Sequence, residues 1–172
     1  MFDAWALDRN TNKTGQFETR LLVDQRQIAQ LAAAAVHQGR LDSNLAIERF
    51  NRVVNQDPST YGDWIQLAQL YRIKGQYSQA VRSTQQAYII ANNHHQIYTT
   101  LILQGDLYYQ QGKLPQANRS YQQAIHTLNE KTGGANHTMT ASLQLEYLST
   151  LQKLGQLQLA VSYTHLTLPT IA

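Results

Sequence analysis

Apolar residues recur at helical spacing along most of this 172-residue chain. The clearest stretch places four of them at positions i, i+3, i+4 and i+7, the spacing that lines one face of an amphipathic helix. These four residues are Trp64, Leu67, Ala68 and Tyr71. Gly75 follows them, and glycine ends helices because it enters the left-handed conformation without penalty. Tyr77, Ala80 and Ala87 then predict a second helix, antiparallel to the first.

The pattern of helix, glycine and helix recurs along the chain. The marker glycines are Gly39, Gly75, Gly112 and Gly155, which are separated by 36, 37 and 43 residues. An alanine follows each glycine by five to seven residues, and its small side chain lets two helix backbones cross closely. We expect the other first helices to bury three stripes: Ile28, Leu31, Ala32 and Ala35; Leu101, Gly105 and Tyr108; Tyr147, Leu148 and Leu151. No such hairpin covers its own apolar face, so neighbouring hairpins must stack.

The 34-residue stretch from Tyr61 to His94 resembles a tetratricopeptide repeat almost position for position. The family pattern is W-x2-L-G-x2-Y, followed by A-x3-F and a closing proline. Here Ala68 stands for its glycine, Thr84 for its aromatic residue and Asn92 for its proline. The resemblance implies an all-α fold, a right-handed α-solenoid of stacked antiparallel helix hairpins with about three and a half units. An ordinary helical bundle with coincidental spacing is the alternative.

The expected solenoid covers residues 18–160. Its repeats are placed at about 25–58, 61–94, 98–130 and, truncated, 141–160. Residues 1–17 form a polar N-terminal segment, which we expect to be a loop or the end of an upstream element. The glycine-bearing connection over 129–137 resembles the longer repeats of kinesin light chains and of bacterial regulators. Thr138 replaces the proline of those repeats and would serve as an N-cap.

The last residues break the repeat pattern. Residues 161–170 back-translate into a string that resembles a transposase-type sequencing adapter read in frame, and Thr164, Thr167 and Pro169 are poor choices for a continuing helix. We therefore expect 161–172 to be a non-native tail, with the natural reading frame continuing past Ala160. A genuine divergent C-terminus is the alternative.

Composition narrows the classes of function. The net charge of +3 is too small to make a phosphate-binding stripe, so we do not expect a nucleic acid partner. Cysteine is absent, which removes disulfides, thiolate nucleophiles and cysteine-based metal sites. The longest apolar run, residues 31–36, is too short to span a bilayer, and the first residues lack the layout of a signal peptide. The compartment stays undecided, with the cytoplasm favoured, and so does the oligomeric state.

The chain offers no pattern that indicates catalysis. His94 and His95 are adjacent in a turn with no carboxylate near them in the sequence, so we do not expect a metal site. The sequence has no glycine-rich phosphate loop, no G-x-S-x-G and no H-E-x-x-H motif. We therefore expect neither an enzyme nor a bound cofactor.

The resemblance also indicates where a partner would bind. In tetratricopeptide folds the concave surface is lined by first-helix positions that point away from the packing stripe. The matching residues form the predicted groove: Ile65, Gln69, Arg72, Ile73, Ile102, Asp106, Tyr109 and Gln110. Its extensions are Ala29, Ala33, Val36 and His37 in the first unit, and Leu145, Ser149, Gln152 and Lys153 in the fourth. This mostly neutral surface suits an extended or helical segment with apolar anchors.

Two considerations limit this prediction. Three of the groove residues, Ile65, Ile73 and Ile102, have the alternative role of contacting the neighbouring repeat or a further helix. Chaperone-docking members of the family grip carboxylates with lysines and asparagines at groove positions. The matching positions here disfavour that activity, because they carry Ala29, Ala33, Ile65 and Gln69.

Three functions fit the resemblance. The first is a non-catalytic scaffold that binds another protein or a peptide in the groove. The second is the sensor segment of a larger bacterial-type regulator, which an effector domain elsewhere in the protein would indicate. The third is an assembly factor for secretion or cell-surface machinery, which a signal or membrane anchor upstream would indicate.

Overall fold

The computed structural model describes residues 4–131, 149–150 and 152–157. Its helices are α1 (Ala4–His37), α2 (Ser43–Gln56), α3 (Tyr61–Ile73), α4 (Tyr77–Ile90), α5 (His94–Gln110) and α6 (Leu114–Lys131). Residues 149–150 and 152–157 are helical as well. The described residues contain no strand, so the all-α prediction is confirmed.

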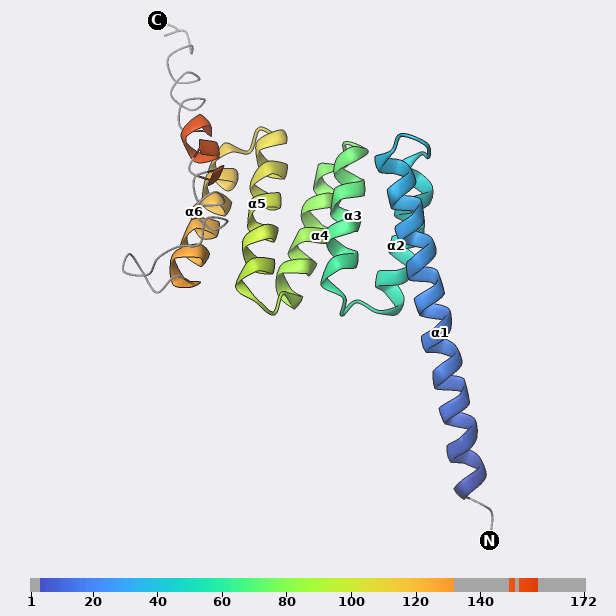
Figure 1. The fold of residues 1–172 in the computed structure, drawn as a ribbon. Coiled ribbons are helices and arrows are strands. Elements are labelled where there is room, and N and C mark those ends of the chain that lie inside the picture. The colour runs from blue at the N-terminus through green and yellow to red at the C-terminus, as the bar shows by residue number, and fades with distance from the viewer. Residues whose placement is uncertain (1–3, 132–148, 151, 158–172) are drawn as a thin grey trace, which may run out of the picture.

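The helices pair into hairpins that stand in a row. α1 packs against α2, α3 against α4 and α5 against α6, while α2 contacts α3 and α4 contacts α5. Figure 1 shows the three hairpins side by side, with the first part of α1 extending beyond the row. This arrangement is the predicted solenoid of antiparallel hairpins.

Three of the four marker glycines end a first helix as expected. Gly39, Gly75 and Gly112 have φ angles of 69°, 75° and 71°, the left-handed region that favours glycine. The prediction for Gly155 is wrong, because this residue lies inside the helical run 152–157. A glycine in a helix costs only about 1 kcal/mol relative to alanine, so packing around it overrides the local signal.

Two hydrophobic clusters are each shared between one hairpin and the next. Leu67 and Leu70 of α3 join the cluster formed by α1 and α2, and Leu103 and Leu107 of α5 join the cluster formed by α3 and α4. Tyr71 packs against both clusters. The hairpins therefore stabilise one another, as expected for a solenoid in which no unit buries its own apolar face.

The buried stripe of α1 differs from the prediction. Ile28 and Leu31 are 49% and 72% exposed, whereas Ala29, Ala33 and Val36 are buried against α2 and α3. In α3 the equivalent side meets the preceding hairpin. The described residues contain no hairpin before α1, so no preceding hairpin covers Ile28 and Leu31, and α1 buries the neighbouring stripe instead.

The helix boundaries differ from the sequence-based expectations at two places. α1 begins at Ala4, so the interpretation of residues 1–17 as a loop is wrong over residues 4–17, which are helical. α5 begins at His94, earlier than the repeat start expected at residue 98. The connection 132–137, the first part of the fourth repeat at 141–148 and the suspected tail at 161–172 lie outside the described residues. Leu154 and Leu157 pack against Ala117 and Tyr121 of α6.

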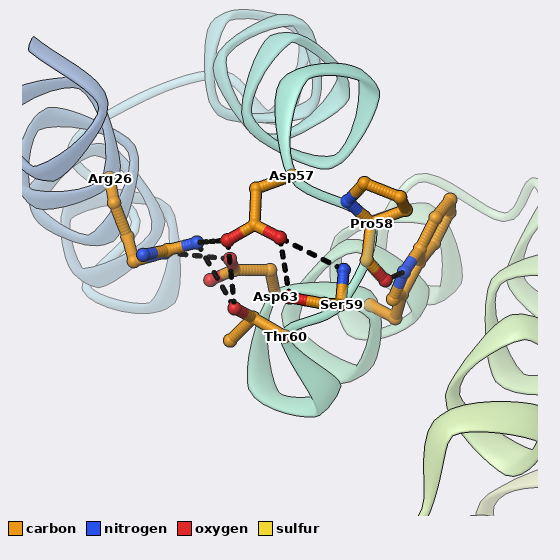
Figure 2. A network of polar contacts seen from close by, with 7 residues as sticks. Arg26, Asp57, Pro58, Ser59, Thr60 and Asp63 are labelled. Atoms are coloured by element: carbon orange, nitrogen blue, oxygen red, sulfur yellow. Dashed lines mark hydrogen bonds and ion pairs between the residues drawn. The ribbon is translucent and has the colours of Figure 1, made fainter. Parts of the chain in front are cut away.

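A polar cluster ties α1 to the start of α3. The Arg26 guanidinium donates to Asp63 at 2.7 Å, to Asp57 at 3.0 Å and to the Thr60 hydroxyl at 3.1 Å. Figure 2 shows the Arg26 side chain reaching across from α1 to these three residues. The Asp63 side chain is only 4% exposed, so its charge depends on the paired guanidinium for stabilisation. We call Arg26, Asp57, Thr60 and Asp63 the Arg26 clasp.

Candidate functional site

The α3 half of the predicted groove is partly exposed. Ile65, Gln69 and Arg72 are half-buried, and Ile73 is 49% exposed. Ile65 packs against the cluster that contains Leu103 and Leu107 of α5, so its alternative role as a contact between repeats holds at least in part. The Arg72 guanidinium forms no ion pair with any described residue. This half therefore presents one available positive charge beside an exposed isoleucine.

The α5 half is more varied. Ile102 is half-buried and packs against the core clusters on both of its sides, which again matches the alternative role. Asp106 is half-buried, Tyr109 is 48% exposed and Gln110 is exposed. The tyrosine thus supplies an amphipathic ring at the surface, a type of side chain that is common in binding hot spots. We call the eight predicted residues of α3 and α5 the groove face.

The charge of Asp106 is engaged by two neighbours. The Tyr121 hydroxyl of α6 donates to its carboxylate at 2.6 Å, and the Lys153 ammonium lies 2.7 and 2.8 Å from its two oxygens. Lys153 also lies 5.8 Å from the centre of the Tyr121 ring. Burial, together with the adjacent Asp106 carboxylate, raises the pKa of Tyr121 above its ordinary value. The tyrosine therefore stays a neutral hydrogen-bond donor, and Asp106 is not a free anion for a partner.

The predicted extensions of the groove fare differently. Ala29, Ala33 and Val36 are buried in the core, so their assignment to the groove is wrong and follows from the rotated stripe of α1. His37 is exposed at the end of α1. Ser149 and Gln152 are exposed, Lys153 is paired with Asp106, and Leu145 lies outside the described residues.

Sequence reasoning missed the role of Tyr121. The sequence pattern indicated no contact between Tyr121 and the groove, and it placed Asp106 and Lys153 on the groove without pairing them. The sole signal was that the two residues occupy the groove register of successive units with opposite charges. Nothing in the sequence shows that the Tyr121 hydroxyl lies close enough to donate a hydrogen bond to Asp106.

The side chains described on the groove face are of types that form noncovalent contacts. Among the described residues, no group of three or more histidine, cysteine or acidic side chains is placed to hold a metal ion. No helix within the described part of the chain is long and apolar enough to cross a membrane. What remains on the groove face is an exposed aromatic ring, an isoleucine, amide groups and the Arg72 guanidinium, all of which act through noncovalent contacts.

Stacked antiparallel hairpins with left-handed glycine turns define a helical-repeat protein. Residues 11–150 match the family described as tetratricopeptide repeat-like domain, and the chain belongs to this family. It is accordingly a protein-interaction module in the general sense. Comparison with curated protein sequences gives no match.

Solved structures of similar fold come from bacteria and eukaryotes. The Yersinia enterocolitica type III secretion chaperone SycD, in complex with a peptide of the translocator YopD, is 17% identical with a TM-score of 0.61, covering 78% of this chain and 92% of that one. The Sgt2 TPR domain from Aspergillus fumigatus is 15% identical with a TM-score of 0.54, covering 77% and 80%. The N-terminal domain of stress-induced protein-1 from C. elegans is 14% identical with a TM-score of 0.60, covering 81% and 96%. At these identities the likeness establishes the fold.

Proposed function

We propose that this chain is a non-catalytic scaffold that binds a segment of another protein on its groove face. The observation that carries the proposal is that Tyr109 and Ile73 are exposed and that Arg72 forms no ion pair with a described residue. Tyrosine and arginine are the residue types that most often supply binding hot spots, because each combines a large contact surface with directed hydrogen bonds.

The charge balance of the groove face indicates the kind of segment it takes. Lys153 neutralises Asp106, so Arg72 is left as the net charge of the surface. A segment with apolar anchors and a single acidic group or a free carbonyl opposite Arg72 fits this pattern. The chaperone SycD, which shares the fold, was solved in complex with a peptide of the translocator YopD. That complex supports the idea that a stack of this type accommodates a peptide.

Core packing beneath the groove face favours a preorganised binding surface. The half-buried Ile65 packs into the cluster that α3 and α4 share with α5, and Ile102 packs into the clusters that α5 shares with α6 and residues 152–157. The exposed residues of the groove face therefore project from a preorganised surface, which reduces the entropy lost when a partner binds.

The test uses peptides selected from a random phage-displayed library against the whole chain. Each peptide is synthesised with a fluorescent label, and its Kd is measured by fluorescence polarisation. We expect Arg72→Ala combined with Tyr109→Ala to weaken binding by about tenfold or more, because two hot-spot side chains are removed. The matched control combines Arg119→Ala with Gln122→Ala, which removes an arginine and a second exposed side chain from α6.

Circular dichroism and urea unfolding establish that both double variants fold. Loss of affinity in the groove variant with retention in the control supports the proposal. Unchanged affinity in a folded groove variant contradicts it.

A further inference from the structure

Two open hollows lie between successive second helices of the solenoid. The first hollow, about 430 Å³, lies between α2 and α4 above α3, and Asn51, Tyr71 and Arg82 line it. The second hollow, about 360 Å³, lies between α4 and α6 above α5, and Tyr88, Leu101 and Tyr108 are among its lining residues. Gln85 of α4 lines both hollows, so the two form a continuous row.

The row of hollows lies away from the groove face. On α3, Trp64 and Tyr71 line the first hollow, whereas Gln69 and Arg72 belong to the groove face. At about 100° per residue, these two sets point in directions about 120° apart around the helix axis. The corresponding residues of α5 follow the same geometry. A segment in the hollows therefore makes contacts that the groove face does not share.

The second hollow has apolar walls and no charged lining residue. Tyr88 and Ile89 of α4 are 45% and 72% exposed although both are large, and Leu101 and Tyr108 of α5 form the opposite wall. The hollow is within the usual size range of binding pockets, roughly 300–1,000 Å³. Large apolar side chains exposed around a hollow favour an apolar side chain of a partner as the occupant.

Three glutamine amides surround these walls. Gln85, Gln104 and Gln123 form no side-chain hydrogen bond with any described residue. Each amide carries two donors and an acceptor, which match the unpaired N–H and C=O groups of an extended chain. A helix satisfies its own backbone groups and gains little from such amides. In the first hollow, by contrast, the Asn51 amide already donates to the Tyr71 hydroxyl at 3.1 Å, and Arg82 adds a charge.

We propose that the second hollow is a second peptide-binding site, which takes an extended, uncharged segment of a partner protein. An apolar side chain of the segment lies between Ile89 and Leu101, and its backbone hydrogen bonds with the glutamine amides. The absence of charge from the lining selects against acidic or basic segments, because a charge there would lose hydration without gaining a partner.

The test uses a phage-displayed library of random peptides that contain no Asp, Glu, Lys or Arg, selected against the whole chain. Selected peptides are labelled, and their Kd is measured for the wild type and for Ile89→Glu. The matched control is Leu31→Glu, because Leu31 and Ile89 are both 72% exposed and lie on α1 and α4 respectively. Both substitutions are at exposed positions, where changes in folding stability stay within about 0.5 kcal/mol.

We expect Ile89→Glu to weaken these peptides by about tenfold or more and Leu31→Glu to change them by less than about twofold. The combined variant Arg72→Ala and Tyr109→Ala should leave them bound. If no uncharged peptide is enriched, or if the enriched peptides keep their affinity for Ile89→Glu, the second site is refuted. Peptides that lose affinity only in the groove variant refute this inference and leave the proposed function standing.

Discussion

Hairpins α3/α4 and α5/α6 have the same architecture but fill their crossing points with different residue pairs. In α3/α4 the two buried positions hold Ala68 and Thr84, and in α5/α6 the equivalent positions hold Gly105 and Tyr121. A Cβ atom on Gly105 would lie 2.3 Å from the Tyr121 ring, so the glycine is required by the tyrosine. Each hairpin thus matches a larger side chain with a smaller one.

The difference reaches the groove face. The Thr84 hydroxyl donates within its own helix, to the Val81 carbonyl at 2.8 Å. The Tyr121 hydroxyl instead donates to Asp106, which Lys153 also binds. The core residue of α5/α6 therefore holds a groove residue in place, whereas the core of α3/α4 leaves Gln69, at the corresponding position, without such a contact. The two hairpins therefore differ in whether a core side chain forms a hydrogen bond with a residue of the groove face.

Both hairpins also carry a carboxylate that a neighbouring helix binds. Asp63 at the start of α3 is bound by Arg26 of α1, and Asp106 of α5 is bound by Lys153 of the helical residues 152–157. The guanidinium reaches three partners, whereas the Lys153 ammonium binds one carboxylate. The geometry of arginine suits a shared clasp of this kind better than that of lysine.

Tyr121→Ala should have the largest effect on stability. It empties a buried site at the crossing of α5 and α6 and removes the donor to Asp106, so we expect a loss of about 3–5 kcal/mol in the free energy of unfolding. Urea unfolding followed by circular dichroism measures it. Tyr109→Ala, at an exposed tyrosine of the same hairpin, serves as the control and should stay within about 0.5 kcal/mol. Equal losses at the two positions would contradict the packing described for Tyr121.

Arg26→Met should destabilise the other hairpin. The substitution keeps the aliphatic stem but leaves the buried Asp63 carboxylate without its cation, at a cost of about 3 kcal/mol. Urea unfolding again provides the measurement. Adding Asp63→Asn to this variant should recover part of the loss, because the unpaired charge is removed. A double variant that is no more stable than Arg26→Met would show that the clasp does not act through charge.

The effect of Gly105→Ala should depend on which residue occupies position 121. With Tyr121 in place, the added methyl overlaps the ring, and we expect a loss of about 2 kcal/mol from overpacking. In a Tyr121→Thr background, which copies the Ala68 and Thr84 pair, the same change should be neutral or stabilising, because alanine is the better helix former. The double-mutant cycle measures this coupling by urea unfolding. Additive effects would mean that Gly105 is not required by Tyr121.

The smallest effect concerns acid stability of the Arg26 clasp. Hydrogen bonds from Ser59, and then from Arg26, lower the pKa of Asp57 from 3.8 to about 2. A lowered pKa in the folded state means that the stabilisation is present above the unfolded pKa and is lost as the pH falls from about 4 to about 2. At neutral pH we expect the free energy of unfolding of the wild type to be about 1 kcal/mol higher than that of Asp57→Asn, after allowing for solvent screening.

Unfolding at a series of pH values provides the measurement for this clasp. The difference between wild type and Asp57→Asn should shrink across that acid range. A difference that is independent of pH would contradict the lowered pKa of Asp57 in the folded protein.

The parts of the fold that sequence could predict are those set by local signals. The spacing of Trp64, Leu67 and Tyr71 predicted the buried side of α3, and the helix-ending glycines predicted three of the turns. The register of α1 could not be predicted, because it depends on which neighbours cover the helix and not on its own apolar pattern. The helix end predicted at Gly155 was wrong for the same reason, because a local preference of about 1 kcal/mol is smaller than the contribution of packing.

The candidate site was predictable only in outline. The register of a first helix identifies which residues point away from the core, and this places Arg72, Ile73 and Tyr109 at the surface as expected. The pairing of Asp106 with Lys153 spans residues far apart in the sequence and depends on the Tyr121 ring. The second hollow was not foreseen at all, because it arises from the gap between second helices, which no single repeat encodes.

The most direct test of binding on the groove face uses the absence of cysteine from the sequence. Gln110→Cys places a single thiol on the groove face, and Gln122→Cys places one on the exposed side of α6 as a control. The rate of thiol labelling is measured with and without a saturating amount of a library-selected peptide that the combined Arg72→Ala and Tyr109→Ala variant fails to bind. We predict that the peptide slows labelling at position 110 and leaves position 122 unchanged. Equal labelling rates at position 110 with and without the peptide would contradict the assignment of the groove face.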